Sequence, residues 1–499
     1  MTLGHRLARP VALAMVGTAV ALAAVSSCSS SGRGTAVGDH RTTTSTIGTS
    51  TRTTELAPSD GAVDPTMRDV PDEVFAGLGD PRIDVADYQV RVRAEPGREE
   101  IAGTARLRLS ATTAEPLRSF TLDLRGPRAT QVLVDGRRAR VAATDDEIEI
   151  TPAVPLEPDR PVSLVITYRG IPEPRSFPRI EAPVGWQPDD QGGWFAMNEP
   201  YGTSSWVPVS DHPSDKATWT ITLDTPAQVT GVANGRLISR RVVAGRRRWV
   251  WETDQPMASY VAVAAVGRYD LVERTGAEDT SVVLAFPPDL SDERRADFDQ
   301  IDPILSFFAD TFGPYPDDDA GAAVVDTSLG LAMETQTRPL FGSDAFRDGE
   351  VWALAHELAH QWYGNAVTPA RWQDLWLNEA FATYADWLWR EHQGEGSVRE
   401  LSDRAGVSSA GNLSVLDTEA AASFDGVLYE GGARALHALR LEVGDDDFFA
   451  LLRRWFTDNR GRSVTTSDFL ELVEAVTGED PEPWADTWLR DPEPPELPR

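Results

Sequence analysis

The sequence has little of three things that often decide the class of a protein: cysteine, positive charge and long apolar runs. Cys28 is the only cysteine among 499 residues, so no disulfide can form within the chain. Asp and Glu number 78 against 47 Lys and Arg, a balance that repels phosphate backbones and argues against nucleic acid as a partner. The uncharged run over residues 11–25 is shorter than the ~20 residues that span a bilayer, so it does not predict a permanent transmembrane helix.

This N-terminal run has the pattern of an export signal. Arg6 and Arg9 precede it, and small residues lead from its end to Cys28. The segment resembles the lipobox of bacterial lipoproteins, which predicts a signal peptide over residues 1–27 and a diacylglycerol group on Cys28. Two acyl chains suffice for stable anchoring, so we expect a lipoprotein on the outer face of the cytoplasmic membrane, in the cell envelope. The alternative is an ordinary cleaved signal, which would leave the protein secreted without an anchor.

The rest of the chain divides by composition into a linker and two folded regions. Residues 28–66 are rich in Ser, Thr and Gly and cannot bury a core, so we expect a disordered tether after the lipidated cysteine. Residues 67–270 alternate apolar and polar side chains in many short segments, which predicts an all-β domain. Helical periodicity dominates residues 271–490, and the Pro-rich residues 491–499 predict a disordered tail.

Individual segments carry these patterns clearly enough to place elements. Strands are predicted at 88–92, 105–109, 120–124, 162–168, 281–286 and 322–325. Helices are predicted at 292–312, 351–363, 377–390, 432–443, 446–457 and 466–477. Asn234-Gly235, which separates two apolar runs, predicts a two-residue β-hairpin.

Two histidines four residues apart, His356 and His360, stand in one of the predicted helices. This spacing puts both imidazoles on one helical face, where they can bind one zinc ion, and places Glu357 beside the open coordination position. A catalytic zinc site needs a third protein ligand, and Glu379 on the next predicted helix can supply it. The sequence therefore predicts one Zn²⁺ per chain, bound by His356, His360 and Glu379.

The segment from His356 to His360, followed by Asn378-Glu379-Ala380, resembles the aminopeptidase N family of zinc peptidases, the gluzincins. The resemblance covers residues 70–489 and is to a short form of that family, without its large helical C-terminal domain. It implies a multidomain α+β fold, in which an N-terminal all-β saddle domain precedes a thermolysin-like, mostly α catalytic domain.

The resemblance also implies roles for single residues. Glu334 stands where the family recognises the free α-amino group of the substrate, and Ala332 and Met333 before it are expected to contact the substrate. Tyr429 takes the place of a tyrosine that stabilises the tetrahedral intermediate. Glu199 aligns loosely with a second anchor for the amine.

Three positions depart from the family pattern. Leu331 and Thr335 replace the first Gly and the Asn of the amine-binding motif, and Gly431 replaces the usual Lys after Tyr429-Glu430. We expect a zinc aminopeptidase that acts on peptides with a free N-terminus and uses Glu357 as its base. The alternatives are a zinc endopeptidase or related zinc hydrolase with an open cleft, and a tethered, non-enzymatic lipoprotein with a vestigial zinc site.

Overall fold

The computed structural model describes residues 72–177, 180, 182–346, 351–405, 413–493 and 495–498. All of these residues belong to one unit of the chain, Pro58–Arg499. The predicted signal peptide, Cys28 and the linker to residue 66 lie outside the described residues. None of the helices in the described part is both long enough and apolar enough to cross a membrane.

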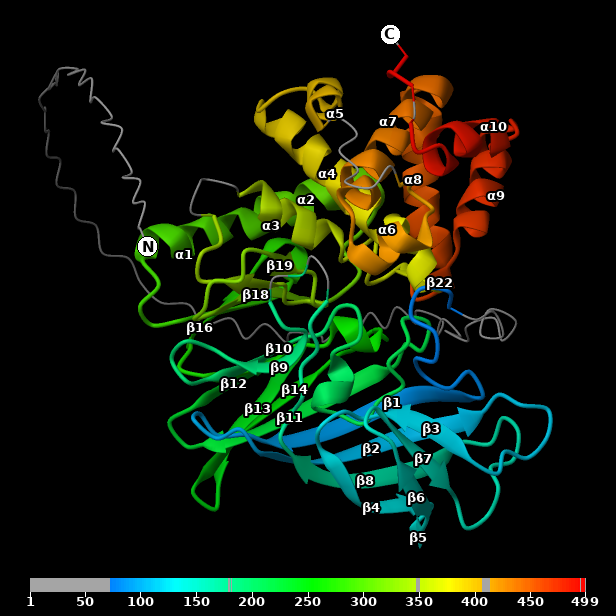
Figure 1. Cartoon of the computed structure of the whole chain (residues 1–499). Coiled ribbons are helices and arrows are strands. Elements are labelled where there is room, and N and C mark those ends of the chain that lie inside the picture. Colours follow the sequence, from blue (N-terminus) through cyan, green and yellow to red (C-terminus); the bar gives the residue numbers. More distant parts are fainter. Residues whose placement is uncertain are drawn as a thin grey trace, which may run out of the picture. The chain divides into compact units, whose positions relative to one another are not determined.

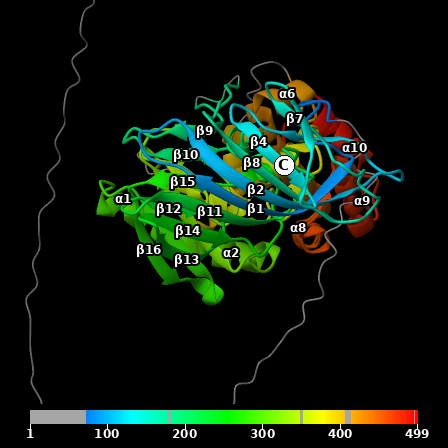
Figure 2. The same cartoon turned by 90° about the horizontal axis from the view of Figure 1, so that it is seen from below.

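The first half of the unit is built on a sheet of eight strands. Along β1 (Ile83–Arg93) the buried side chains of Tyr88, Val90 and Val92 alternate with the exposed ones of Gln89, Arg91 and Arg93. One face of the sheet therefore covers the core and the other faces solvent. In Figure 2 the central strands lie side by side in the order of their pairing. That order is β13 (Arg236–Val243), β14 (Arg246–Glu252), β11 (Thr218–Pro226), β1, β2 (Ile101–Ala111), β8 (Val162–Gly170), β4 (Arg128–Val134) and β5 (Arg137–Arg138).

Two smaller sheets complete this half. One has the order β3 (Phe120–Asp123), β7 (Glu147–Thr151) and β6 (Arg140–Ala143). The other has the order β12 (Thr230–Ala233), β15 (Ala264–Gly267), β10 (Trp194–Met197) and β9 (Gly185–Pro188). The predicted strands at 88–92, 105–109, 120–124 and 162–168 fall on β1, β2, β3 and β8, and the strand-rich character of this half is confirmed.

The hairpin predicted at Asn234-Gly235 is wrong. β12 before it pairs with β15, whereas β13 after it pairs with β14, so the two residues form a corner between two sheets. Gly235 has φ 74°, and an added Cβ would lie 2.0 Å from the carbonyl oxygen of Glu252, so only glycine fits. An Asn-Gly pair supplies the same backbone freedom to a corner as to a hairpin, and only the strand pairing separates the two.

The second half combines a five-stranded sheet with helices. The sheet has the order β16 (Asp270–Thr275), β17 (Ser281–Phe286), β18 (Asp319–Val325), β20 (Leu340–Gly342) and β19 (Ala332–Met333), and a short parallel pair joins β21 (Thr368–Pro369) to β22 (Ser463–Val464). The main helices, which gather together in Figure 1, are α2 (Ile301–Phe312), α3 (Trp352–Ala359), α4 (Trp376–Gln393), α7 (Gly432–Val443), α8 (Asp445–Asn459) and α9 (Thr466–Thr477). Shorter helices are α1 (Asp292–Asp297), α5 (Val398–Ala405), α6 (Thr418–Ser423) and α10 (Glu482–Ala485). The α+β class, with a mostly helical second half, is confirmed.

The long helix predicted over 292–312 is interrupted. α1 ends at Asp297, a 3₁₀ turn spans Phe298–Gln300, and α2 begins at Ile301. Pro303 explains the new start, because proline has no N–H to donate and is tolerated in the first turn of a helix but not in its interior.

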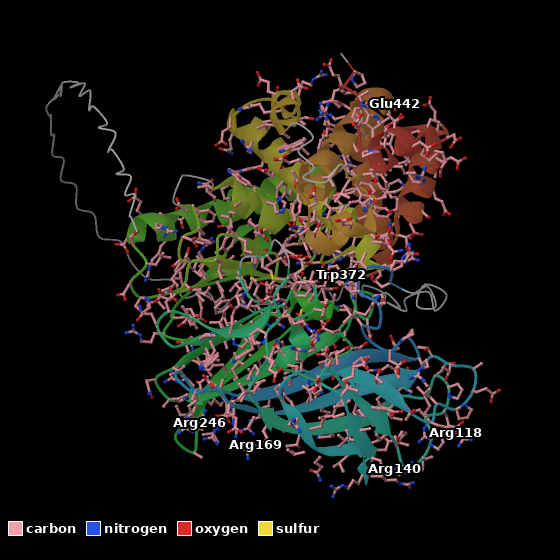
Figure 3. The ribbon with its side chains drawn as sticks, viewed as in Figure 1. Arg118, Arg140, Arg169, Arg246, Trp372 and Glu442 are labelled. Atoms are coloured by element: carbon pink, nitrogen blue, oxygen red, sulfur yellow. The ribbon has the colours of Figure 1, made fainter. Side chains whose placement is uncertain are left out.

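The two halves meet through buried polar contacts. Lys216, the single lysine of the chain, donates from Nζ to the carbonyl oxygens of Asn365 (2.7 Å) and Ala366 (3.0 Å). Trp372, labelled in Figure 3 where strands and helices meet, donates its backbone N–H to Asp72 (2.6 Å). Lys216 is only 8% exposed, and this burial lowers the pKa of its ammonium group to about 7.

The disordered tail stays a prediction for 491–499, but some of its described residues contact the helices. Leu497 is buried, and Arg434 donates to the carbonyl oxygen of Pro495 (3.2 Å). An apolar side chain and a backbone acceptor are enough to hold this short segment against α7.

Asn234 generates a stability prediction. Its side chain donates to the carbonyl oxygens of Val261 (2.9 Å) and Gln336 (2.8 Å) and accepts from the N–H of Val263 (2.7 Å), all buried. We expect Asn234→Ala to lower the free energy of unfolding by about 2–4 kcal/mol, because three buried backbone groups lose their partner.

Urea unfolding followed by tryptophan fluorescence measures this loss. Asn459→Ala is the matched control, since the side chain of Asn459 donates to one backbone group, the carbonyl oxygen of Trp455, near the end of α8. Equal unfolding midpoints for the two variants would contradict the assigned role of the corner.

Candidate metal and peptide site

The first two metal-binding side chains come from one helix end. His356 lies in α3, and His360 caps it one residue after its last turn. The i, i+4 spacing brings their Nε2 atoms to 3.2 Å from each other, with the rings nearly perpendicular at 82°. Both rings thus direct a nitrogen to the same point.

Glu379 supplies the third donor from the first turn of α4. Its Oε2 lies 3.5 Å from Nε2 of His356 and 3.5 Å from Nε2 of His360. Tetrahedral zinc with bonds of about 2.0–2.1 Å requires its ligand atoms to lie roughly 3.3–3.4 Å apart. The three donor atoms, two imidazole nitrogens and one carboxylate oxygen, therefore fit a zinc ion in both chemistry and spacing.

Neighbouring groups fix the orientation of these donors. Nδ1 of His360 lies 3.1 Å from the carbonyl oxygen of Tyr363, so this nitrogen carries the proton and Nε2 presents its lone pair to the metal. Asn378, the residue before Glu379, donates to the hydroxyl of Tyr260 (2.9 Å). Tyr260 belongs to the strand-rich half, so that half also holds the start of α4.

Glu199 and Glu334 bring two further carboxylates to the same place. Oxygens of Glu199, Glu334 and Glu379 all lie within 4.8 Å of one another. Oε1 of Glu199 and Oε1 of Glu334 are buried and have no hydrogen-bond partner in the described part of the chain. Burial, and then the Glu334 carboxylate, raises the pKa of Glu199 well above its ordinary value. Burial also raises the pKa of Glu334 to about 7, with His360 opposing and Glu379 adding to the shift.

The loop that carries Glu334 is held from the zinc helix. Gln361 and Asn365 donate their side-chain amides to the carbonyl oxygen of Glu334, at 3.2 and 2.7 Å. Before the loop, Ala332 and Met333 form β19 and pair with β20. Thr335, which replaces the asparagine of the family motif, is buried and turns its hydroxyl to the carbonyl oxygen of Arg338 (2.5 Å). Its side chain thus stabilises the loop.

Glu357 and Tyr429 flank the metal donors. Glu357 is only 7% exposed, and burial, with the Glu334 and Glu379 carboxylates, raises its pKa well above the ordinary value against the pull of His360. Tyr429 lies in the π-turn Val427–Gly431, with its ring centroid 6.2 Å from that of His356. Gly432, three residues after Tyr429, packs closely against α4. A Cβ added at Gly432 would lie only 2.5 Å from Cβ of Ala380. This close approach carries Tyr429 over the site.

A cavity of about 700 Å³ opens from these residues. It borders His356, Glu357 and Tyr429 and extends along α4 past Thr383, Asp386 and Arg390. The sequence analysis missed these three, although Thr383 and Asp386 follow Glu379 at helical spacings of four and seven residues, which put them on one face of α4. Their spacing was visible in the sequence, but their position along a cavity was not.

The structure thus brings together nine of the ten candidate residues of the sequence. Seven lie at or beside the metal donors: His356, His360, Glu379, Glu357, Tyr429, Glu334 and Glu199. Ala332 borders the cavity, as Leu331 does, and Met333 ends β19 directly before Glu334. Cys28, the tenth, lies outside the described residues.

Comparison with known families matches both halves of the chain. Residues 86–261 match the Peptidase M1 N-terminal domain, and residues 336–488 match the Peptidase family M1 domain. Rice (Oryza sativa subsp. japonica) aminopeptidase M1-B is 26% identical over 307 residues, which are 57% of this chain and 35% of the rice protein. Human (Homo sapiens) glutamyl aminopeptidase is 24% identical over 322 residues, 59% of this chain and 33% of the human protein. The chain spans about a third of the length of these curated relatives.

Solved structures match over a larger share of the chain. The crystal structure of an M1 zinc metallopeptidase from Deinococcus radiodurans has a TM-score of 0.77 and 31% identity, and the match covers 86% of this chain and 98% of that one. A mutant of that enzyme bound to a Tyr-Ser-Ala substrate matches with a TM-score of 0.78, 31% identity, and coverage of 86% and 99%. With the three zinc donors in place and both domains matched, this chain belongs to the M1 family of zinc metallopeptidases.

Proposed function

We propose that this protein is a zinc-dependent aminopeptidase that releases the N-terminal residue of peptides. The observation that carries the proposal is the pair of carboxylates beside the metal donors, half-buried Glu199 and buried Glu334. Each has a buried oxygen that finds no hydrogen-bond partner among the described residues. Buried carboxylates are costly unless a cation neutralises them. The α-ammonium of a peptide has the charge and the three N–H donors to do so.

This placement would set the position of cleavage. An ammonium held by Glu199 and Glu334 lies within one residue of the metal donors, because Glu379 shares the same 4.8 Å cluster. Only the first peptide bond then reaches the metal. Holding the first peptide bond beside the metal makes the reaction effectively intramolecular. This positioning is a large part of enzymatic rate enhancement.

The remaining residues supply the proton chemistry. Zinc, when held by His356, His360 and Glu379, polarises a carbonyl and lowers the pKa of water. Glu357 takes a proton from the attacking water and returns it to the nitrogen of the leaving amine. The hydroxyl of Tyr429 donates to the oxyanion that develops on the carbonyl oxygen. The raised pKa of Glu357, caused first by burial, suits a group that must hold the proton between these steps.

We also propose that the protein is lipid-anchored at the outer face of the cytoplasmic membrane. The support is the sequence before Cys28, with Arg6 and Arg9, the uncharged run 11–25 and small residues at its end. The Ser/Thr/Gly-rich residues 28–66 would let the enzyme reach peptides at a distance from the membrane.

Metal binding is tested by Glu379→Gln. This change keeps the shape of the side chain but removes its negative charge, so we expect zinc affinity to fall by more than about 100-fold. Competition with a chromophoric chelator and metal analysis measure the affinity and the stoichiometry. Glu395→Gln, an exposed carboxylate just beyond the end of α4, is the control and keeps wild-type affinity. Unchanged zinc binding in Glu379→Gln would contradict the ligand set.

Turnover is tested by Glu357→Gln on aminoacyl fluorogenic amides. We expect kcat to fall by about 10²–10⁴-fold with zinc still bound, because the general base is lost while the three donors stay intact. Chelation of the wild type should abolish cleavage, and added zinc should restore it. Glu442→Gln, on the exposed side of α7 (Figure 3), should behave as wild type. Full activity of Glu357→Gln would exclude the proposed mechanism.

Anchoring is tested by Cys28→Ser. Wild-type protein expressed in a bacterium should incorporate an alkyne-labelled fatty acid and sediment with membranes, because the Cys28 thiol carries the acyl groups. The variant should incorporate no label and leave the membrane fraction. Equal labelling of both proteins would refute the anchor.

A further inference from the structure

The cavity beside the metal donors has walls from four parts of the catalytic half. Trp352 and His356 lie on α3, Thr383 and Asp386 on α4, and Tyr429 in the π-turn before α7. The fourth wall is the chain around β19 and β20, with Leu331 and Phe341. A volume of about 700 Å³ is ample for an amino-acid side chain.

The amine anchors do not line the cavity. The cavity borders His356, Glu357 and Tyr429, but neither Glu199 nor Glu334 is among its lining residues. A peptide whose α-ammonium sits at Glu199 and Glu334, with its first carbonyl at the metal, must continue away from those carboxylates. The cavity therefore receives the residue directly after the scissile bond.

Asp386 is a buried carboxylate in the wall of this cavity. Its side chain is 3% exposed, and its Oδ1 is buried without a hydrogen-bond partner in the described part of the chain. The other oxygen lies 4.0 Å from Arg390, beyond hydrogen-bond length. Arg390 forms ion pairs with both Asp386, at 4.0 Å, and Glu395, at 3.8 Å, and its guanidinium lies over the ring of Trp352 at 5.7 Å. Oδ1 of Asp386 thus has no hydrogen-bond donor among the described residues.

The distance from the metal donors to Asp386 matches a long cationic side chain. Glu379 and Asp386 are seven residues apart on one face of α4, an advance of about 10 Å along the helix axis. The four methylenes and terminal nitrogen of lysine reach about 6 Å from Cα, and that Cα follows the scissile carbonyl by two bonds. The terminal cation would then lie near the carboxylate of Asp386.

The surrounding charges favour the same ligand. Asp344 and Glu430 also border the cavity, and Arg390 is the one cationic side chain among its lining residues. Asp344 is already bonded to Ser328 and to the N–H of Leu329, and Glu430 is exposed to solvent. Of these three acids, Asp386 is therefore the one with a buried oxygen that has no donor among the described residues. A lysine or arginine side chain in the cavity would donate a hydrogen bond to the Asp386 carboxylate. An apolar side chain would exclude water from the same carboxylate without supplying a donor, which is unfavourable.

We propose that Asp386 makes the protein select peptides with lysine or arginine directly after the scissile bond, as the second residue of the substrate. This specificity rests on the proposed aminopeptidase function, which fixes the direction in which the substrate runs. Asp386 acts on binding in the cavity and takes no part in the proton transfers at Glu357.

The test compares tetrapeptides that differ only in their second residue. Ala-Xaa-Ala-Ala is offered to the zinc-loaded full-length enzyme with Xaa as lysine, arginine, glutamate or norleucine, and the release of the first alanine gives kcat/KM. Norleucine matches the lysine stem without its charge. For the wild type we expect lysine and arginine to exceed norleucine by at least about tenfold, because a charge-assisted bond in a desolvated site is worth at least that ratio.

Asp386→Asn tests the residue itself. The lysine-to-norleucine ratio should fall to within about threefold of unity, since the amide removes the charge but keeps the shape. A ratio measured within one variant is independent of how much of that variant folds. Asp403→Asn, an exposed carboxylate on α5, is the matched control and should keep the wild-type ratio.

The outcomes separate this inference from the function beneath it. Two results would overturn the role of Asp386 but leave the aminopeptidase function intact. One is equal cleavage of the norleucine and lysine peptides, and the other is a preference for glutamate, which Arg390 would cause. A lysine preference that appears only when lysine is the first residue, in aminoacyl fluorogenic amides, overturns the assignment of the cavity to the second residue. Failure of the zinc-loaded enzyme to cleave any free-amine substrate overturns the aminopeptidase function as well.

Discussion

The mutual repulsion of four crowded carboxylates, three of them buried and Glu199 half-buried, is the constraint on which the rest of the site depends. Glu199, Glu334, Glu357 and Glu379 crowd around two imidazoles, and burial is the largest cause that opposes ionisation of each of them. Only Glu379 has its pKa lowered, to about 2, because the two histidines beside it outweigh burial. Such a cluster can be fully ionised only when cations share it. A divalent metal ion at the donors and an ammonium at Glu199 and Glu334 supply that positive charge. Binding of the metal and binding of the substrate therefore both reduce the repulsion among the same carboxylates.

The scaffold keeps these groups close although they come from both halves of the chain. Asn234, at the corner between two sheets, bonds the carbonyl oxygen of Gln336, two residues after Glu334. Tyr260 holds Asn378 beside Glu379, and Lys216 holds the loop after the zinc helix. The strand-rich half thus acts as more than a platform, because its backbone and side chains fix both the amine-binding loop and the third metal ligand. Loss of any of these contacts would let the carboxylates separate, which repulsion favours.

Local patterns in the sequence were enough to predict the helices and the metal ligands. The features that the sequence analysis missed depend on contacts between residues far apart in the chain. The predicted bounds of α7 and α9 coincide with the observed ones, and the spacing of His356 and His360 fixed two donors, because each depends on residues within one or two helical turns. The corner at Asn234 was mistaken for a hairpin because the partner of β12 is β15, which lies 30 residues later. Asp386 escaped notice because its spacing from Glu379 is visible in the sequence, whereas its burial and its open oxygen arise only from the packing of α3, α4 and the π-turn.

The central claim is that the carboxylates beside the metal donors confine cleavage to the first peptide bond. The most direct test gives the zinc-loaded enzyme one unstructured decapeptide in two forms, with a free and with an N-acetylated terminus, and follows the products by mass spectrometry. The account predicts that the free peptide is shortened one residue at a time from its N-terminus while the acetylated peptide stays intact. Internal cleavage of the acetylated peptide would contradict it and would identify an endopeptidase with an open cleft.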